Sequence, residues 1–279
     1  MRPFRYSHYY VGAFLLLTIW AFWPSYFAVF GEASFAHHLH GLTATLWIVL
    51  LMTQNIAIQH RKRQIHIWFG WSSLLLVPVF TAGGLLTTLV TLQSEGPFHD
   101  MFGVRLATAD LIGSILFCTF FALALRHRRD VQRHSRYMLA TVTLLIGPSF
   151  ARLLTNNIPP FKIETFAELP KFGQAADASL VFTIVFLLTL VLWDIRNRKP
   201  AVPFTLALVG NVVMYHGYYT WARSESWHQA ADLLATLPAW LVCLVGLLIG
   251  IVASLYGWQA GMPRQASSRD KIRVSVLAE

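Results

Sequence analysis

Residues Leu233 to Trp258 read LLATLPAWLVCLVGLLIGIVASLYGW and contain no Asp, Glu, Lys or Arg. A helix needs roughly 20 consecutive apolar residues to cross a hydrocarbon core about 30 Å thick. This stretch is long enough, and the basic residues Arg264, Arg269, Lys271 and Arg273 follow it. The stretch therefore predicts a transmembrane helix that leads into a basic segment.

The composition of the whole chain agrees with a membrane location. Of 279 residues, 56% are hydrophobic and 13% are charged. That charged share is about half of what an ordinary soluble domain carries, and the charges gather in short runs between apolar stretches. The pattern argues against a water-soluble fold. It predicts an all-α, polytopic transmembrane helix bundle as a single domain over residues 1–258, followed by a cytoplasmic tail over residues 259–279.

Eight apolar stretches are of spanning length, so the sequence predicts a bundle of about eight helices. The predicted segments are Tyr9 to Phe30, His38 to Ile58, Ile67 to Leu92, Gly103 to Leu125, Tyr137 to Thr155, Ala178 to Trp193, Ala201 to Tyr219 and Leu233 to Trp258.

The basic residues predict the orientation of these helices. Loops on one side hold 17 of the 22 Lys and Arg residues, which are Arg2, Arg5, Arg61, Lys62, Arg63, Arg126, Arg128, Arg129, Arg133, Arg136, Arg196, Arg198, Lys199 and the four of the tail. The other side keeps Arg105, Arg152, Lys162, Lys171 and Arg223. Because cytoplasmic loops are enriched in Lys and Arg, both termini are expected in the cytoplasm, with the protein in a bacterial inner (plasma) membrane. The net charge of +9 then reflects topology and contact with membrane lipids, and it does not indicate a nucleic-acid partner.

The first predicted helix has two interpretations. Arg2 and Arg5 precede an apolar run, as in a signal peptide, and small residues follow at Ala33 and Ser34. The run is long and bulky, however, whereas the apolar region of a signal peptide is typically about 7 to 15 residues. The sequence favours a retained helix over a cleaved one.

Small residues and prolines mark sites of close packing or bending. Gly246, Gly250 and Ser254 recur every four residues in the last segment, which permits close approach of another helix. That helix could belong to the same chain, to a second copy in a homo-oligomer or to a partner in a membrane complex. Breaks are expected at Pro78 and Gly83–Gly84 in the third segment and at Gly147–Pro148 in the fifth.

Eleven histidines fall near the two sides of the predicted bundle. On the outer side, His37 and His40 share a helical face and His99 precedes the fourth segment. Imidazole ligates zinc, copper and haem iron, so His37, His40 and His99 are candidate metal ligands. The alternative is that such histidines anchor helix ends at the lipid headgroups.

Histidines on helix starts also suggest haem ligation. His66 and His134 begin the third and fifth segments on the inner side, where they could be axial ligands to one haem, and His40 and His216 could hold a second haem near the outer side. The alternative for His66 and His134 is contact with anionic headgroups, because dense basic runs surround both residues.

Two charged residues lie inside predicted helices. An ionised group in hydrocarbon costs about 3 kcal/mol even on lenient scales, so Asp110 and Arg152 need a reason to be there. Adjacent antiparallel helices could join them as a structural ion pair, or both could face a ligand. Asn211 and Tyr215, four residues apart, could border the same cavity. The sequence thus predicts one polar pocket lined by His40, Asp110, Arg152, Asn211, Tyr215 and His216.

Two regions carry a family resemblance. Residues 40–47 (HGLTATLW), Gln54 and residues 63–70 (RQIHIWFG), together with residues 133–140 (RHSRYMLA), resemble an uncharacterised family of bacterial multi-pass membrane proteins with paired histidine/arginine helix-start motifs. The resemblance covers about half of the chain and implies no established reaction. A looser similarity is to the di-haem membrane cytochromes b, which pair histidines between alternate helices at two depths. This chain departs from them because its fourth segment has Asp110 and no interior histidine to pair with His40.

These observations support more than one function. The histidine placement favours haem- or metal-linked electron transfer, with haem b or a transition metal on His40, His66, His134 and His216. The alternative is a non-enzymatic transporter or small-ligand sensor that uses the pocket around Asp110 and Arg152. A third hypothesis is an assembly factor for another membrane complex. The chain has no Gly-x-Ser-x-Gly elbow, Gly-rich phosphate loop or His-Glu-x-x-His pair, and the sequence leaves open whether it is an enzyme.

Overall fold

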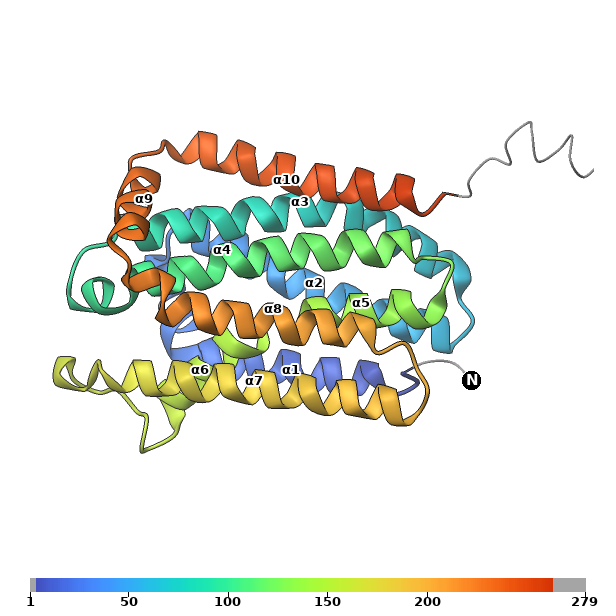
Figure 1. The fold of residues 1–279 in the computed structure, drawn as a ribbon, viewed down its shortest axis with the longest axis horizontal. Helices are drawn as coiled ribbons and strands as arrows, with labels where there is room; N and C mark the ends of the chain where they lie inside the picture. Colours follow the sequence, from blue (N-terminus) through green and yellow to red (C-terminus); the bar gives the residue numbers. More distant parts are fainter. Residues whose placement is uncertain (1–3, 263–279) are drawn as a thin grey trace, which may run out of the picture.

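The computed structural model describes residues 4–262, and the described chain is 84% helix with no strand (Figure 1). The predicted all-α class is therefore confirmed. Arg2 and the basic residues of the predicted tail lie outside the described residues. The α-helices are α1 (Ser7–Phe22), α2 (Phe35–Gln59), α3 (Arg63–Gln93), α4 (Pro97–Arg126), α5 (Val131–Thr143), α6 (Ile146–Asn157), α7 (Lys171–Arg196), α8 (Val202–Tyr219), α9 (Glu225–Ala235) and α10 (Ala239–Ala260).

Seven helical stretches in the described part are long and apolar enough to cross a membrane. They are Ser7–Phe27, Phe35–Gln59, Arg63–Gln93, Pro97–Arg126, Val131–Asn157, Lys171–Arg196 and Ala239–Ala260. The remaining predicted segment forms α8, which is helical but shorter and carries the polar residues Asn211 and His216. These long apolar helices are consistent with a multi-pass integral membrane protein.

The ends of the described chain lie at the same end of the bundle, on the right of Figure 1. The turns between α2 and α3, α4 and α5, and α7 and α8 lie there too. We call this the basic end, because these turns contain Arg61, Lys62, Arg128, Arg129, Arg198 and Lys199. The other end, which we call the opposite end, carries α9 and the loop between α6 and α7.

The helices pack as a closed ring. Going round it, α1 contacts α2, then follow α3, α4, α8, α7 and α6, and α6 returns to α1, while α10 covers α3 and α4 from outside. α5 packs against α4 and α8, and the indole N–H of Trp47 in α2 donates to the Thr141 hydroxyl of α5 at 2.9 Å. Trp47 and Thr141 are completely buried, so α5 fills the centre of the ring toward the basic end. An aromatic core of Trp47, Phe80, Phe117 and Phe121 surrounds this position.

The fifth predicted segment divides into two helices. α5 ends at Thr143 and α6 begins at Ile146, so the break lies slightly before the predicted Gly147–Pro148 position. Pro148 is the third residue of α6. The first four N–H groups of a helix have no partner within that helix, so a proline at this position costs no helical hydrogen bond. The break lets α6 pack between α1 and α7 instead of continuing the line of α5.

α1 packs as part of the ring. The Thr18 and Ser149 hydroxyls are 3.1 Å apart, and the Asn156 side chain donates to the Ala21 carbonyl at 2.9 Å. These contacts join α1 to α6 and are what a retained first helix would make.

The prediction of one continuous helix from Leu233 to Trp258 was wrong, because Pro238 separates α9 from α10. The small-residue ridge on α10 contacts α3 of the same chain. A Cβ on Gly246 would lie 2.5 Å from the Ala82 Cα, and a Cβ on Gly250 would lie 2.4 Å from the Pro78 Cα. Ser254 is buried as well. α3 therefore covers Gly246 and Gly250 of this ridge, and a homo-oligomer or a partner in a membrane complex stays a prediction.

Candidate functional site

His40 lies one and a half turns into α2 and faces α3. Its ring stacks on Phe80 with centroids 5.1 Å apart and an angle of 24° between the planes. The Nδ1 atom is buried and has no hydrogen-bond partner in the described structure. Gly83 makes this approach possible, because a Cβ there would lie 3.1 Å from the His40 Cα. The predicted break at Gly83–Gly84 is thus a close contact between two helices, and α3 runs through it without interruption.

Asp110 lies on the face of α4 that it shares with Ser114, Phe117 and Phe121, at helical spacing. Phe117 and Phe121 contact Trp47 of α2, so this face points to the inside of the ring. Asp110 is deep in the bundle with protein on every side, yet its side chain is exposed to accessible space. Both observations hold together if the carboxylate borders an internal cavity.

Arg152 approaches the same region from α6. Its guanidinium lies over the Phe22 ring of α1, 5.3 Å from the ring centroid, and the residue is deep in the bundle. Arg152 interacts electrostatically with Asp110 and with His37, and His37 interacts in the same way with His40. Side chains from α2, α4 and α6 thus form one linked set, which we call the polar chamber and define by His37, His40, Asp110 and Arg152.

The two opposite charges of the chamber do not touch. Four ion pairs between described residues have N–O distances within 4.0 Å: Asp130–Arg133, Arg136–Asp194, Lys162–Glu164 and Glu168–Lys171. Asp110 and Arg152 do not form such a pair in the described structure. Uncompensated charges in a low-dielectric interior cost several kcal/mol each. A gap between a deep carboxylate and a deep guanidinium is therefore a place for water or for a ligand that contacts both.

The other residues of the predicted pocket lie on α8, which packs mainly against α4 and α7. Asn211 is buried, donates to the Ala207 carbonyl at 2.9 Å and leaves its Oδ1 without a partner in the described structure. Tyr215 packs against Tyr219 with centroids 5.0 Å apart. His216 is on the exposed face of α8, edge-on to Trp221. His40 and His216 thus have different ring neighbours, Phe80 and Trp221, and a haem shared between them stays a prediction.

The three candidate metal ligands of the outer side have separate partners. His37 Nδ1 is 2.7 Å from the hydroxyl of Ser34, the N-cap residue of α2. His99 Nδ1 donates to the Thr91 carbonyl at 2.8 Å and ties the start of α4 to the end of α3. Residues 4–262 contain no group of three or more His, Cys, Asp or Glu side chains arranged to hold a metal ion, so His37, His40 and His99 do not converge on one.

The inner pair of histidines does come together. The rings of His66 and His134 have centroids 6.5 Å apart and planes at 88°. His134 Nδ1 donates to the Ala124 carbonyl at 2.9 Å, which leaves Nε2 as the acceptor nitrogen. His66 Nδ1 is buried without a hydrogen-bond partner in the described structure.

Sequence reasoning missed two polar clusters. At the basic end, Arg136 of α5 and Asp194 of α7 form a buried two-point ion pair with N–O distances of 2.6 and 2.7 Å. At the opposite end, the Tyr219 hydroxyl donates to Asp177, and Arg105 interacts electrostatically with Asp177. Asp194 offered a signal, since it is an acid placed directly between an apolar stretch and a basic run.

Comparison with protein-family models, curated proteins and solved structures found no match to this chain. The class that the fold defines is a multi-pass membrane protein, consistent with its seven long apolar helices. Any further assignment rests on the chamber and on the histidine pair.

Proposed function

We propose that this integral membrane protein binds a small polar solute in the polar chamber, as a transporter or a sensor would. One observation carries the proposal. Asp110 and Arg152 lie deep in the bundle and interact electrostatically, but they form no ion-pair contact. Asp110 also borders accessible space. A purely structural ion pair would close to contact distance, as Arg136 and Asp194 do.

The chemistry of the chamber favours a solute with both charges. The Asp110 carboxylate accepts hydrogen bonds from an ammonium or attracts a quaternary amine, and the planar Arg152 guanidinium matches a carboxylate or phosphate. His40 Nδ1 adds one hydrogen bond that the described protein does not use. A zwitterion would neutralise both charges at once and so offset the cost of burying them.

Charge distribution supports an orientation for this site. We place the basic end in the cytoplasm and α8 as an additional crossing, so that the chamber lies in the outer half of a bacterial inner membrane. The resemblance to bacterial multi-pass membrane proteins agrees with this placement and stays a prediction.

A thermal-stability screen tests the proposal. Purified protein in detergent is heated with amino acids, betaines and phosphocholines, since a ligand that binds only the folded state raises Tm with concentration. We expect a zwitterion to raise Tm in the wild-type protein and in the exposed control variant Glu164→Gln, but not in Asp110→Asn or Arg152→Gln. The proposal fails if no zwitterion raises Tm, or if the shift persists in both chamber variants.

The histidine pair favours a second candidate, a haem- or metal-linked redox function. Its support is the 6.5 Å approach of His66 and His134 together with the His134 Nδ1 hydrogen bond, because a backbone partner on one nitrogen is how proteins orient a ligating imidazole. The test is an absorption spectrum and metal analysis of the purified protein. A Soret band or stoichiometric copper, zinc or iron that is lost in His66→Ala and kept in His60→Ala would support it. If the wild-type protein shows neither a Soret band nor stoichiometric metal, the redox function is refuted.

A further inference from the structure

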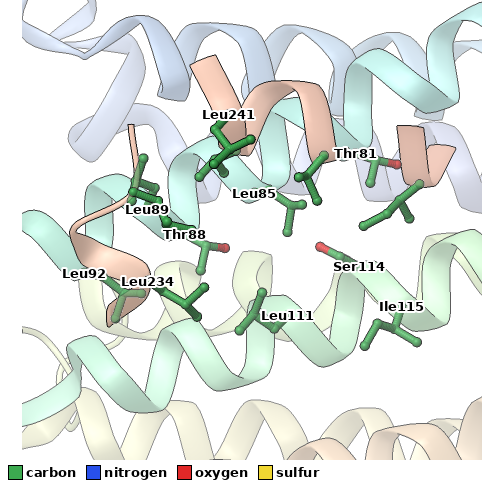
Figure 2. Close-up of a pocket in the computed structure, with 14 residues that line it drawn as sticks. Thr81, Leu85, Thr88, Leu89, Leu92, Leu111, Ser114, Ile115, Leu234 and Leu241 are labelled. Carbon is green, nitrogen blue, oxygen red and sulfur yellow. The ribbon is translucent and has the colours of Figure 1, made fainter. Parts of the chain in front are cut away.

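An apolar groove of about 320 Å³ lies on the outside of the ring, between α10 and α4 with α3 as its floor (Figure 2). Its walls are almost entirely leucine, isoleucine and valine side chains. Ile115, Val245 and Ile249 of the groove are exposed, so it opens toward the lipid. From Leu241 to Ile249 the groove follows α10 for ~12 Å at 1.5 Å per residue, close to half the thickness of the ~30 Å hydrocarbon core. These dimensions suit one acyl chain of one membrane leaflet.

The groove has one unsatisfied polar group on its wall. Thr81 and Thr88 donate to the carbonyls of Val77 and Gly84 in their own helix. Ser114 makes no hydrogen bond with any described residue, and Figure 2 shows its hydroxyl on the α4 side of the groove, directed to the space between the helices. A free hydroxyl on an apolar wall is a binding position for a polar group that enters with the chain.

The groove and the polar chamber meet at Gly84. A Cβ on Gly84 would lie 3.6 Å from the Ser114 Oγ and 3.7 Å from the His40 Nδ1. The wall between groove and chamber at this point is thus the bare glycine backbone together with Ser114. Asp110 follows on the same face of α4, one turn from Ser114. Polar groups therefore lead from the groove wall through His40 to Asp110 and Arg152.

From this continuity we infer that the ligand of the chamber is a single-chain amphiphile with a zwitterionic head, which enters from the membrane. Its chain lies in the groove, and its head passes Gly84 and Ser114 to reach Asp110 and Arg152. This inference rests on the proposed function and names its substrate class. A lysophospholipid with a choline head has the matching chemistry, with an ammonium for Asp110 and a phosphate for Arg152.

The test compares a full amphiphile with its head group alone. Myristoyl lysophosphatidylcholine binding is measured by native mass spectrometry of the detergent-solubilised protein, and glycerophosphocholine binding by thermal shift. Val245→Trp fills the groove without touching the chamber, and Leu244→Trp is its matched control, since Leu244 is the adjacent exposed residue of α10 and does not line the groove. Gly84→Val places a side chain between Ser114 and His40.

We expect Val245→Trp and Gly84→Val to weaken lysophosphatidylcholine binding at least about tenfold, a change of about 1.4 kcal/mol. Leu244→Trp is expected to bind lysophosphatidylcholine as the wild-type protein does, and Asp110→Asn is expected to lose binding of both probes.

If glycerophosphocholine binds in an Asp110-dependent way while Val245→Trp leaves lysophosphatidylcholine binding unchanged, the inference fails and the proposed function stands. If lysophosphatidylcholine binds equally well to the wild-type protein and to Asp110→Asn, the chamber is not its head-group site and the inference again fails. If neither probe binds the wild-type protein, the inference fails, and the wider zwitterion screen decides the proposed function separately.

Discussion

At the residue scale, the Arg136–Asp194 pair shows what a structural ion pair looks like in this bundle. Both side chains are almost fully buried, and Asp194 accepts two hydrogen bonds from the guanidinium. Arg136 also donates to the side chain of Gln132 at 2.7 Å and lies over the Phe4 ring. The pair joins α5 to α7 at the basic end and leaves little of either charge without a partner.

We expect Asp194→Asn to lower the free energy of unfolding by about 3–5 kcal/mol, because it leaves the Arg136 charge buried without its counter-charge. Reversible unfolding in mixed micelles, followed by circular dichroism, measures the change. Glu164→Gln breaks the exposed Lys162–Glu164 pair and should leave stability unchanged. Equal effects of the two substitutions would contradict the structural importance of the buried pair.

The sequence could locate Asp110 and Arg152 but not the Arg136–Asp194 pair, for a physical reason. A charge in the middle of an apolar stretch stands out because of its cost in hydrocarbon. Arg136 is one of several basic residues that follow one another in the chain, and the sequence alone does not say which of them is buried. Which nearby charges touch, as Arg136 and Asp194 do, and which stay apart, as Asp110 and Arg152 do, depends on helix positions that only the folded chain has.

At the element scale, α10 is held against α3 by backbone contact at its glycines. A Cβ on Gly250 would meet the Pro78 backbone at 2.4 Å, whereas one on Gly113 of α4 would meet nothing within 4 Å. This contrast offers a matched pair of substitutions within the same protein.

We expect Gly250→Ala to destabilise the protein by about 1–3 kcal/mol, because rigid backbone has to move to admit one methyl group. Gly113→Ala should leave the unfolding free energy unchanged or slightly raised, since alanine favours a helix over glycine. The same unfolding measurement applies to both variants. If Gly250→Ala is as stable as Gly113→Ala, the packing of α10 on α3 described above is incorrect.

The loop between α6 and α7 depends on a carboxylate at its end. A hydrogen bond from Lys171 at 2.6 Å, with N–H groups of Glu164 and Thr165, holds the pKa of Glu168 at about 2, below its ordinary value of 4.5. A lowered folded-state pKa stabilises the loop fully above pH 4.5, and the stabilisation disappears as the pH falls through about 2.

Hydrogen exchange at the Glu164 and Thr165 amides checks this pH dependence. We expect protection, after correction for intrinsic rates, to persist at pH 4 and to be lost near pH 2, the pKa of Glu168. Lys171→Gln removes the strongest partner, so its loss of protection should begin at higher pH. Identical profiles for the two proteins would show that Lys171 does not set the titration.

Helix existence was predictable and helix boundaries were less so. The apolar stretches locate the spans because length and hydropathy are properties of the chain itself. The α9–α10 corner was missed, since Thr236, Leu237 and Pro238 are as free of charge as the helix that follows. Gly83–Gly84 was expected to break α3, but its glycines serve a helix contact that depends on where α2 lies.

At the scale of the whole molecule, the proposed orientation decides in which half of the membrane the polar chamber lies. A fluorescent-protein fusion after Glu279 should fluoresce, and alkaline phosphatase inserted after Lys162 should be active, because the basic end is expected inside and the α6–α7 loop outside. The reverse pattern would place the chamber in the cytoplasmic half of the membrane.

The central claim is that the bundle encloses a water-accessible polar chamber at Asp110. The direct measurement is the reaction of Asp110→Cys, in a Cys118→Ala, Cys243→Ala background, with a small charged methanethiosulfonate. Only a hydrated thiol ionises and reacts readily. Ala107→Cys, at a buried position on the same helix, is the control. We expect fast modification at position 110, slowed by a bound zwitterion, and little modification at position 107. Modification of Asp110→Cys no faster than that of Ala107→Cys would contradict it.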